Sequence, residues 1–253
     1  GQLRKVFARY EGATHNPSRS RITAAYGDAR FDATAATRME LARKARHFER
    51  NNGIVNALAD QFENYTIGTG LVLTPSSSDP EWNKRATEWW RGWEQNCDLT
   101  SRASFGTVQS LAARTWFIDG ECFIPLVRGE SGRPRIQLLE GHVCATPDKL
   151  SDMEGKTVID GVNIEKNGRP ASYWIGEQNG SRLVFTTPKP AEFMIHIFEP
   201  SRPGMYRGIT FLYPVINDLH DLDDLQILEM QAAKQHAEIS RVITTESGEL
   251  NPA

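Results

Sequence analysis

The longest helical pattern in the sequence is FLYPVINDLHDLDDLQILEMQAAKQHAEISR, residues 211–241. Its apolar side chains recur at steps of three and four residues, which is the spacing of an α-helix. They are Val215, Leu219, Leu222, Leu225 and Leu228, followed by Ala232, Ala233, Ala237 and Ile239. No Gly or Pro interrupts the stretch after Pro214, so the sequence predicts one helix about 40 Å long. Such a helix is stabilised mainly by packing, and it therefore needs a partner surface in the preceding domain or in another chain.

The composition is that of a folded protein and limits the possible functions. The 253 residues allow one large domain or two small ones, and the apolar and charged contents of 39% and 24% are ordinary. A net charge of −3 argues against a protein that grips DNA through a broadly basic surface. It does not exclude a protein that handles DNA without gripping it. We expect neither a membrane span, since no run of 18 apolar residues occurs, nor a signal peptide.

Three cysteines, Cys97, Cys122 and Cys144, are odd in number and far apart. Their spacing matches no zinc site, and we expect reduced, partly buried thiols of a cytosolic type of compartment.

The N-terminal half predicts an arm followed by helices. Residues 1–35 are rich in Arg with poor periodicity; they are either a disordered terminus or an arm that packs on a neighbouring subunit or shell. Residues 37–65 keep helical spacing, and Asn51, Asn52 and Gly53 should break this helix into two. The first half carries a basic face, for which solvation is the ordinary interpretation and phosphate contact the alternative. This face consists of Arg38, Arg43, Lys44, Arg46 and Arg50.

The next region contains a short predicted strand and a tryptophan-rich helix. Residues 71–73 follow two glycines and predict a strand. Asp79 should cap a helix that begins at Pro80. Trp82, Trp89 and Trp93 then fall on one helix face, which predicts a core stripe, with stacking on single-stranded nucleic acid as the alternative.

The remainder alternates between helix and strand. A helix over residues 104–117 should turn Phe105, Val108, Leu111, Ala112 and Thr115 inward. Residues 122–127 and 135–141 predict a β-hairpin, and its acids Asp119, Glu121 and Glu140 do not form a recognisable catalytic pair.

Further strands are expected around Asp160-Gly161 and Asn167-Gly168, which are hairpin turn signals. Two more are expected at residues 182–187 and 192–200, with His196 as a partly exposed structural histidine. The fold class is therefore α+β with a long helix near the end.

Segments spread over nearly the whole chain resemble the lambda-like portal proteins of tailed bacteriophages. The matching segments are Tyr10-Glu11-Gly12-Ala13, Arg50-Asn51-Asn52, Ile67-Gly68-Thr69-Gly70-Leu71, Asp119-Gly120-Glu121, Gly161-Val162, Gly168-Arg169-Pro170, Tyr173-Trp174, His196-Ile197-Phe198-Glu199-Pro200, Arg202-Pro203-Gly204, Tyr206-Arg207-Gly208 and Leu222-Asp223-Asp224. Their order and spacing together carry the resemblance. One departure is Tyr26, where the family pattern leads us to expect Trp.

The resemblance implies a portal fold, in which a helical and β-hairpin wing domain is followed by a long stem helix. The wing would be residues 1–208 with an arm at 1–35, the stem helix 209–241, and the start of a clip 242–253. The second stem helix, the channel loop and the crown of such proteins would normally follow. The chain thus corresponds to the N-terminal portion of a portal protein.

By the same resemblance, the protein has no enzymatic activity and no cofactor. It would form a homo-oligomeric ring, usually of twelve copies, at one capsid vertex of the virion, after assembly in the host cytoplasm. Double-stranded DNA would pass through the ring during packaging and ejection without sequence readout. Terminase, capsid and neck or head-completion proteins would be its partners, and no membrane would be involved.

The long helix would then have two kinds of functional residue. Its acids would line the channel and repel phosphates, although acids near a helix N-terminus are also favoured by the helix dipole alone. These are Asp218, Asp221, Asp223, Asp224 and Glu229. Apolar and small residues would form the contact between subunits, where alanine permits close helix packing. These are Leu222, Leu225, Leu228, Ala232 and Ala233.

Two other functions fit parts of the same helix. A metal-dependent DNA-processing enzyme could use His220 with Asp221, Asp223 and Asp224, but it would need further convergent carboxylates and a basic DNA surface. A capsid or tail scaffold protein without a channel would need the assembly helix and no acidic lumen.

Overall fold

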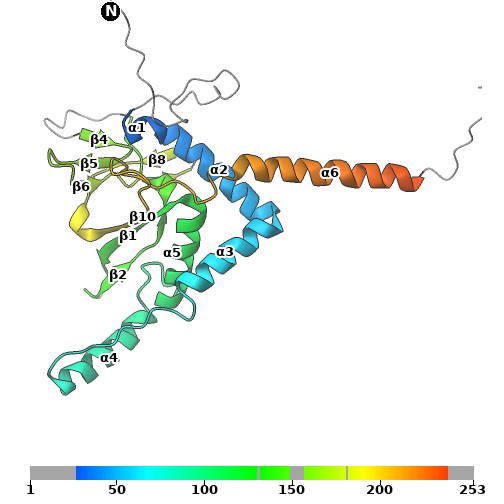
Figure 1. Ribbon diagram of the computed structural model, residues 1–253. Coiled ribbons are helices and arrows are strands. Elements are labelled where there is room, and N and C mark those ends of the chain that lie inside the picture. Colours follow the sequence, from blue (N-terminus) through cyan, green and yellow to red (C-terminus); the bar gives the residue numbers. More distant parts are fainter. Residues whose placement is uncertain (1–26, 130–131, 149–156, 181, 239–253) are drawn as a thin grey trace, which may run out of the picture.

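The computed structural model describes residues 27–129, 132–148, 157–180 and 182–238. Most of the expected arm, the end of the stem helix and the expected clip lie outside these residues. Figure 1 shows a body of helices and small sheets from which one helix, α6, extends away. The α+β fold class is confirmed.

Six α-helices are present in the described ranges. They are α1 (Ala29–Asp32), α2 (Ala35–Asn51), α3 (Gly53–Thr66), α4 (Pro80–Glu94), α5 (Phe105–Asp119) and α6 (Ile216–Glu238). The predicted break between α2 and α3 is confirmed. Asn52 ends α2 with an extended backbone, and its side-chain oxygen accepts from the N–H groups of Ile54 and Val55 to begin α3. Asp79 caps α4 in the same way, with Pro80 at its first turn as predicted.

The strands form three antiparallel sheets. The first has β1 (Glu121–Arg128) at its centre, flanked by β10 (Met194–Phe198), β2 (Pro134–Ile136) and β3 (Leu139–Glu140). The second contains β4 (Thr157–Ile159), β5 (Val162–Ile164), β6 (Pro170–Tyr173) and β9 (Lys189–Pro190), and the third pairs β7 (Glu177–Asn179) with β8 (Arg182–Val184). The short 3₁₀ turn η3 (Gly141–Val143) follows β3, and η4 (Ala191–Phe193) lies between β9 and β10.

The predicted hairpins are confirmed in this arrangement. Leu126 pairs with Ile136 across β1 and β2. Asp160 and Gly161 join β4 to β5 with φ values of 45° and 83°, the left-handed region that such two-residue turns require.

Three apolar clusters form the core. The first joins α2, α3 and α5 to the start of α6 and contains Ala45, Phe48, Val55, Ala59, Ile118, Leu212 and Ile216. The second lies between α5 and the first sheet, and the third lies between the first and second sheets. All three cysteines are free, as the sequence predicted, and they are fully rather than partly buried. Burial raises the pKa of Cys122 and Cys144 to about 12.

Residues 71–73 do not form the predicted strand. The side chain of Gln109 takes the place of a partner strand: its Oε1 accepts from the N–H of Leu71 at 2.8 Å, and its Nε2 donates to the carbonyl of Leu71 at 3.2 Å. Leu71, Val72 and Leu73 remain exposed. One side-chain amide is therefore enough to fix an extended segment without a sheet.

The prediction that the tryptophan stripe is core is wrong for two of its three members. Trp82 and Trp89 are 49% and 51% exposed, and α4 contains no buried residue. The C-terminal end of α4 contacts the body, where Trp93 and Trp90 pack on Phe105. Sequence spacing predicts one apolar helix face, but it does not say whether the same chain covers that face.

Two smaller predictions were also wrong. Leu111 is 47% exposed, because α5 turns Val108 and Ala112 toward the first sheet. The long helix begins at Ile216, not at residue 211, since residues 211–215 form turns in which Val215 donates to the carbonyl of Leu212.

Candidate functional site: the base of the projecting helix

A buried carboxylate, Glu121, lies where the body meets the segment that leads into α6. It is the first residue of β1 and is fully buried. Arg207 donates from Nη2 to Glu121 Oε1 at 2.6 Å and from Nε to Oε2 at 2.9 Å. The backbone N–H of Gly208 donates to the same Oε2 at 2.9 Å. Two consecutive residues before α6 are thus bound by one side chain of the first sheet.

Arg38 adds helix α2 and the second sheet to this site. Its Nη1 donates to Glu121 Oε1 at 3.0 Å, and its Nε donates to Asp160 Oδ2 at 2.8 Å. Asp160 belongs to the turn between β4 and β5, and Arg207 Nη1 lies 3.4 Å from its Oδ2. Two guanidinium groups and two carboxylates therefore balance in charge, as buried ions must.

The prediction that the basic face of α2 is solvated is wrong for Arg38, which is 3% exposed. It is also wrong for Arg46, whose Nε donates to Asp119 Oδ1 at 2.7 Å. Arg43 and Arg50 are exposed, as the prediction requires.

His196 completes what we call the buried ion cluster: Arg38, Glu121, Asp160, His196 and Arg207. Its Nε2 lies 3.1 Å from Glu121 Oε2, and its ring stacks between Phe123 and Phe198. The residue as a whole is half-buried, as expected for a partly exposed structural histidine, although its side chain alone is only 5% exposed. Burial lowers the pKa of His196 despite its carboxylate neighbour, so a neutral ring donates its Nε2–H to Glu121.

The electrostatics keep Glu121 ionised. Burial opposes its charge, but Arg207 and the hydrogen bond from His196 outweigh burial and hold the pKa of this carboxyl far below its usual range. Burial likewise opposes the charge of Arg207, while Glu121 raises its pKa. Arg207 also donates to the carbonyls of Cys144 at 2.8 Å and Gly141 at 2.7 Å. These charged groups bind one another, so the cluster is suited to fixing elements in place and not to acid–base catalysis.

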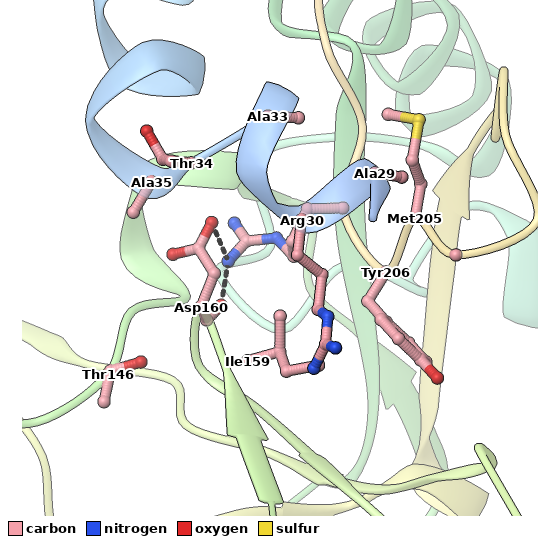
Figure 2. A pocket seen from close by; sticks show the side chains of 12 residues that line it. Ala29, Arg30, Ala33, Thr34, Ala35, Thr146, Ile159, Asp160, Met205 and Tyr206 are labelled. Atoms are coloured by element: carbon pink, nitrogen blue, oxygen red, sulfur yellow. Dashed lines mark hydrogen bonds and ion pairs between the residues drawn. The ribbon is translucent and has the colours of Figure 1, made fainter. Parts of the chain in front are cut away.

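A small pocket borders the cluster on its Asp160 side. Figure 2 shows Asp160 between the α1–α2 connection and the segment that carries Met205 and Tyr206. The pocket has a volume of about 230 Å³, and Thr34 and Ala35 at the start of α2 line it. Asp160 and Arg207 of the cluster thus border a surface pocket beside the short helix α1.

Two glycines allow the backbone to cross directly above the cluster. Gly120 has a φ of 86°, and a Cβ on either Gly120 or Gly208 would overlap backbone atoms of the opposite segment. Gly208 thus permits a close crossing of the two segments. Beyond it, Phe211 donates its N–H to the carbonyl of Phe117 at 3.1 Å and packs its ring against Phe62, Trp116 and Phe117.

Helix α6 leaves the body one turn later. Leu212 and Ile216 are buried in the first core cluster. Asn52 Nδ2 donates to Asp223 Oδ1 at 2.9 Å, so the cap of α3 also holds α6. Past this point α6 extends away from the body (Figure 1), and its large apolar side chains are more than half exposed. These are Leu225 at 54%, Ile227 at 53%, Leu228 at 62% and Met230 at 60%.

Four of the five acids expected to line a channel fall on one broad side of α6. At about 100° per residue, Asp218, Asp221, Asp224 and Glu229 lie within a sector of about 140°, whereas Asp223 is turned the other way, toward Asn52. The other four, Asp218, Asp221, Asp224 and Glu229, are exposed. Of the residues expected between subunits, Leu222 and Ala232 are half-buried, whereas Leu225, Leu228 and Ala233 are exposed.

Two apolar stripes run along α6 on different sides. Leu225, Leu228 and Ala232 follow one side at steps of three and four. Ile227 and Met230 continue the opposite side, which Ile216 and Leu219 bury against the body. A helix with two apolar sides can contact two neighbouring elements at once.

No group of three or more metal-ligating side chains lies together in the part of the chain that the structure describes. His220 Nδ1 lies 3.4 Å from Asp224 Oδ2, and both side chains are exposed. Asp223 is bound to Asn52 on another side of the helix. Within the same residues, no helix has the length and apolar character needed to span a bilayer.

Sequence reasoning missed the buried ion cluster. The available signal was a charged residue at the start of an apolar strand, Glu121, together with Arg207 between Tyr206 and Gly208. Both belong to segments that carry the family resemblance, but their pairing joins residues 86 positions apart.

Comparison with known proteins identifies the family. Residues 18–252 match the family described as phage portal protein, lambda family. A probable portal protein of Halomonas phage phiHAP-1 is 29% identical over 174 residues, which are 63% of this chain and 31% of that protein. Portal protein B of Escherichia phage lambda is 22% identical over 226 residues, 78% of this chain and 42% of that protein.

A portal protein of Escherichia phage N15 is 25% identical over 122 residues, 45% of this chain and 23% of that protein. The chain thus spans less than half the length of these relatives. It belongs to the lambda family of phage portal proteins.

Proposed function

We propose that this member of the lambda portal family assembles into a ring around a channel at one vertex of the capsid. Double-stranded DNA would enter the head through this channel during packaging and leave through it during ejection. The observation that carries the proposal is α6, a helix held at one end only, with four large apolar side chains more than half exposed. A monomer rarely leaves such a surface uncovered, and copies arranged around an axis cover it.

The two apolar sides of α6 support a cyclic arrangement. In a ring each stem helix has a neighbour on both sides, so it needs contact residues on more than one face. Leu225, Leu228 and Ala232 would meet one neighbour, and Ile227 and Met230 the other. In this proposal α6 is the stem helix, the residues before it form the wing, and twelve copies close the ring.

The ring would act at the capsid vertex of the virion after assembly in the host cytoplasm. We propose terminase, capsid and neck or head-completion proteins as its partners, and a structural role without turnover. The base of α6 fits this role, since it positions a helix and offers no reactive group.

The charge of α6 supports passage of DNA without binding. The helix carries six carboxylates and a single lysine, Lys234. A wall of this sign repels phosphates, so DNA can slide. Replacing Asp221 and Asp224 by Lys should leave the ring intact and make DNA retention rise steeply as salt is lowered. Asp223 is left unchanged because it binds Asn52.

The matched control makes the same charge change outside the stem. Glu81 and Glu88 on α4 are exposed, and their replacement by Lys should leave DNA retention unchanged in a packaging assay. Equal retention by the stem variant, the control and the wild type would contradict a channel-lining role for α6.

The ring itself is tested by mass and by shape. Light scattering on a full-length protein, as long as its relatives, should give the mass of a large closed oligomer. Electron-microscope class averages should show a ring with a central hole. Leu225→Glu together with Leu228→Glu should abolish that species. A monomer at full length, or an assembly without a hole, would overturn the channel proposal; the second result would favour a scaffold protein.

A further inference from the structure

Helix α4 and the segment before it form a rigid arm, residues 67–95, which we call the tryptophan arm. In Figure 1 α4 extends from the lower end of the body, apart from α6. At its start the N–H of Ser77 donates to Asn83 Oδ1 at 2.9 Å, and Asn83 Nδ2 donates to the carbonyl of Ser77 at 3.0 Å. At its end Trp93 Nε1 donates to the carbonyl of Pro134 at 2.7 Å. The first pair of bonds closes the loop onto the start of α4, and the second bond holds the end of α4 on the body.

One face of this arm is apolar, and Trp82 and Trp89 on it are about half exposed. Trp82, Ala86, Trp89 and Trp93 follow one another at steps of four, three and four, which places them on one side of α4. Trp89 stacks on Trp93 with ring centroids 6.3 Å apart. Each tryptophan offers about 150–250 Å² of surface, and tryptophan is enriched among the residues that dominate binding energy. A preorganised aromatic face of this kind is suited to docking on another surface.

A second uncovered stripe lies on the outer face of α3. Ile54, Leu58 and Tyr65 are 53%, 45% and 86% exposed, and they share one side of the helix because they are four and seven residues apart. Ala57 and Gln61, also exposed, lie between them. This stripe carries no charge, and depletion of charge is typical of the centre of a protein interface.

The two stripes match in length and in spacing. Trp82, Trp89 and Trp93 are separated by seven and then four residues, whereas Ile54, Leu58 and Tyr65 are separated by four and then seven. Antiparallel helices therefore bring Trp82 opposite Tyr65 and Trp89 opposite Leu58, over a stripe about 16 Å long at 1.5 Å per residue. A parallel arrangement would leave the two middle residues out of register.

We propose that the tryptophan arm of one copy packs antiparallel on the outer face of α3 in the adjacent copy of the ring. This inference rests on the proposed function, because only a head-to-tail ring uses two different faces of each subunit in every contact. The arm does not reach α3 of its own copy, since Trp93 and Trp90 hold α4 against Phe105 and Pro134.

The size of the stripe also favours a contact within a ring. Two half-exposed tryptophans and their neighbours supply on the order of 300 Å², below the roughly 800 Å² that each partner contributes to a standard interface. The arm alone would not hold two copies together. It adds to the contact of the stem helices and fixes the angle between adjacent bodies.

An apolar pocket of about 500 Å³ is the competing position for the arm. It lies between α5 and the first sheet, and Ile124, Leu126 and Ile195 line it. The copy's own Trp93 and Phe105 also line this pocket, so a second arm would have to enter beside the first. The stripe on α3 has no such obstacle. The test below therefore distinguishes docking on α3 from docking in the pocket.

The test is a cross-link between two variants of the protein, each with one added cysteine. One population carries Trp89→Cys and the other Leu58→Cys; they are mixed before assembly and treated with a short bifunctional maleimide. Because Cys97, Cys122 and Cys144 are buried, native thiols give little background, and an unmodified mixture measures what remains. We expect a covalent dimer in the assembled ring, and also from the pair Trp82→Cys with Tyr65→Cys.

Three comparisons make the result specific. Trp82→Cys with Ile54→Cys tests the opposite register and should give at least tenfold less dimer. Val184→Cys, an exposed position on β8, should give none with Trp89→Cys. A cross-link of Trp89→Cys to Ile195→Cys in place of Leu58→Cys would overturn the inference in favour of the pocket.

The outcomes separate this inference from the proposed function. Rings without the expected cross-link overturn the docking of the arm and leave the channel proposal standing, whereas a full-length protein that remains monomeric overturns both. Circular dichroism and ring formation check that each variant folds, and Trp89→Phe gives a second measurement without cysteine. That variant should preserve the ring, whereas Trp89→Asp should raise the protein concentration needed for assembly by about tenfold.

Discussion

Replacing Arg207 by leucine tests whether the buried ion cluster joins the body to the base of α6. In the native protein the guanidinium binds both carboxylate oxygens of Glu121, at 2.6 and 2.9 Å. Leucine fills part of the volume but donates no hydrogen bond. Glu121, which has no exposed surface, would keep only Arg38, His196 and the N–H of Gly208 as partners, and the cluster would carry one unbalanced negative charge.

The magnitude follows from that unbalanced charge. Breaking a buried ion pair by removing one partner costs about 3–5 kcal/mol, against a typical free energy of unfolding of about 5–15 kcal/mol. We expect Arg207→Leu to lose this amount in urea unfolding followed by circular dichroism. Glu121→Gln leaves the opposite charge unbalanced, so the double variant restores neutrality and should be more stable than the sum of the single effects by about 1–3 kcal/mol.

The buried ion cluster also makes the stability of the protein depend on pH. The folded protein depresses the pKa of Glu121 below its ordinary value of 4.5 and that of His196 below 6.5. The unfolded chain therefore binds these protons at higher pH than the folded one, and stability falls as the pH drops through 6.5 and then 4.5. Glu121→Gln should remove the lower of these two steps. A loss of less than about 1 kcal/mol in Arg207→Leu, or strictly additive effects in the double variant, would refute the ion cluster as the joint.

Two further substitutions test the parts of the joint that carry no charge. Gly208→Ala should prevent folding or cost several kcal/mol, because its Cβ would overlap the backbone at Gly120. The control is Gly92→Ala, which has open space around it and should stabilise α4 by up to about 1 kcal/mol. Equal thermal midpoints for the two variants would contradict the close crossing of the backbone at Gly208. Asn52→Ala should cost about 1–2 kcal/mol of stability through loss of the α3 cap. It should also raise amide hydrogen exchange in the first turns of α6, because the hydrogen bond to Asp223 is lost. Unchanged exchange there would show that this hydrogen bond does not hold the helix.

Local chemistry was predictable from the sequence wherever a single residue type decides the backbone. Asn52 between two helical stretches, Asp79 before Pro80, and Asp160 before Gly161 each signal a cap or a turn. The structure has a cap or turn at all three positions. These signals depend on neighbours within three residues, so no tertiary contact can override them easily.

The buried ion cluster was not predictable in the same way. Arg38 and Arg43 lie on the same basic helix and look alike in the sequence, yet Arg38 is buried and Arg43 is exposed. The difference is set by Glu121, 83 residues away from Arg38. A charged residue is buried only where such a partner balances its charge. A pairing over this distance produces no periodic pattern in the sequence.

The sequence also did not predict which apolar helix faces are covered within this chain. The spacing of Trp82, Trp89 and Trp93 and the spacing of Leu219, Leu222 and Leu225 both predict one apolar face. The structure buries little of either. In both cases the spacing indicates that the apolar face needs a packing partner, but it does not indicate whether the same chain or another chain supplies that partner.

The joint at α6 carries a mechanical consequence for the proposed ring. Arg207 and Gly208 bind Glu121 immediately before the helix, Phe211 packs into an aromatic cluster, and Asp223 is bound by Asn52. These contacts lie between Arg207 and Asp223 and reach three different parts of the body, so no free hinge separates body and helix. A rotation of α6 would therefore turn the whole body with it. In a closed ring, the angle between neighbouring stem helices then sets the angle between neighbouring bodies, and the tryptophan arm can dock on α3 only at the angle that the stem helices allow.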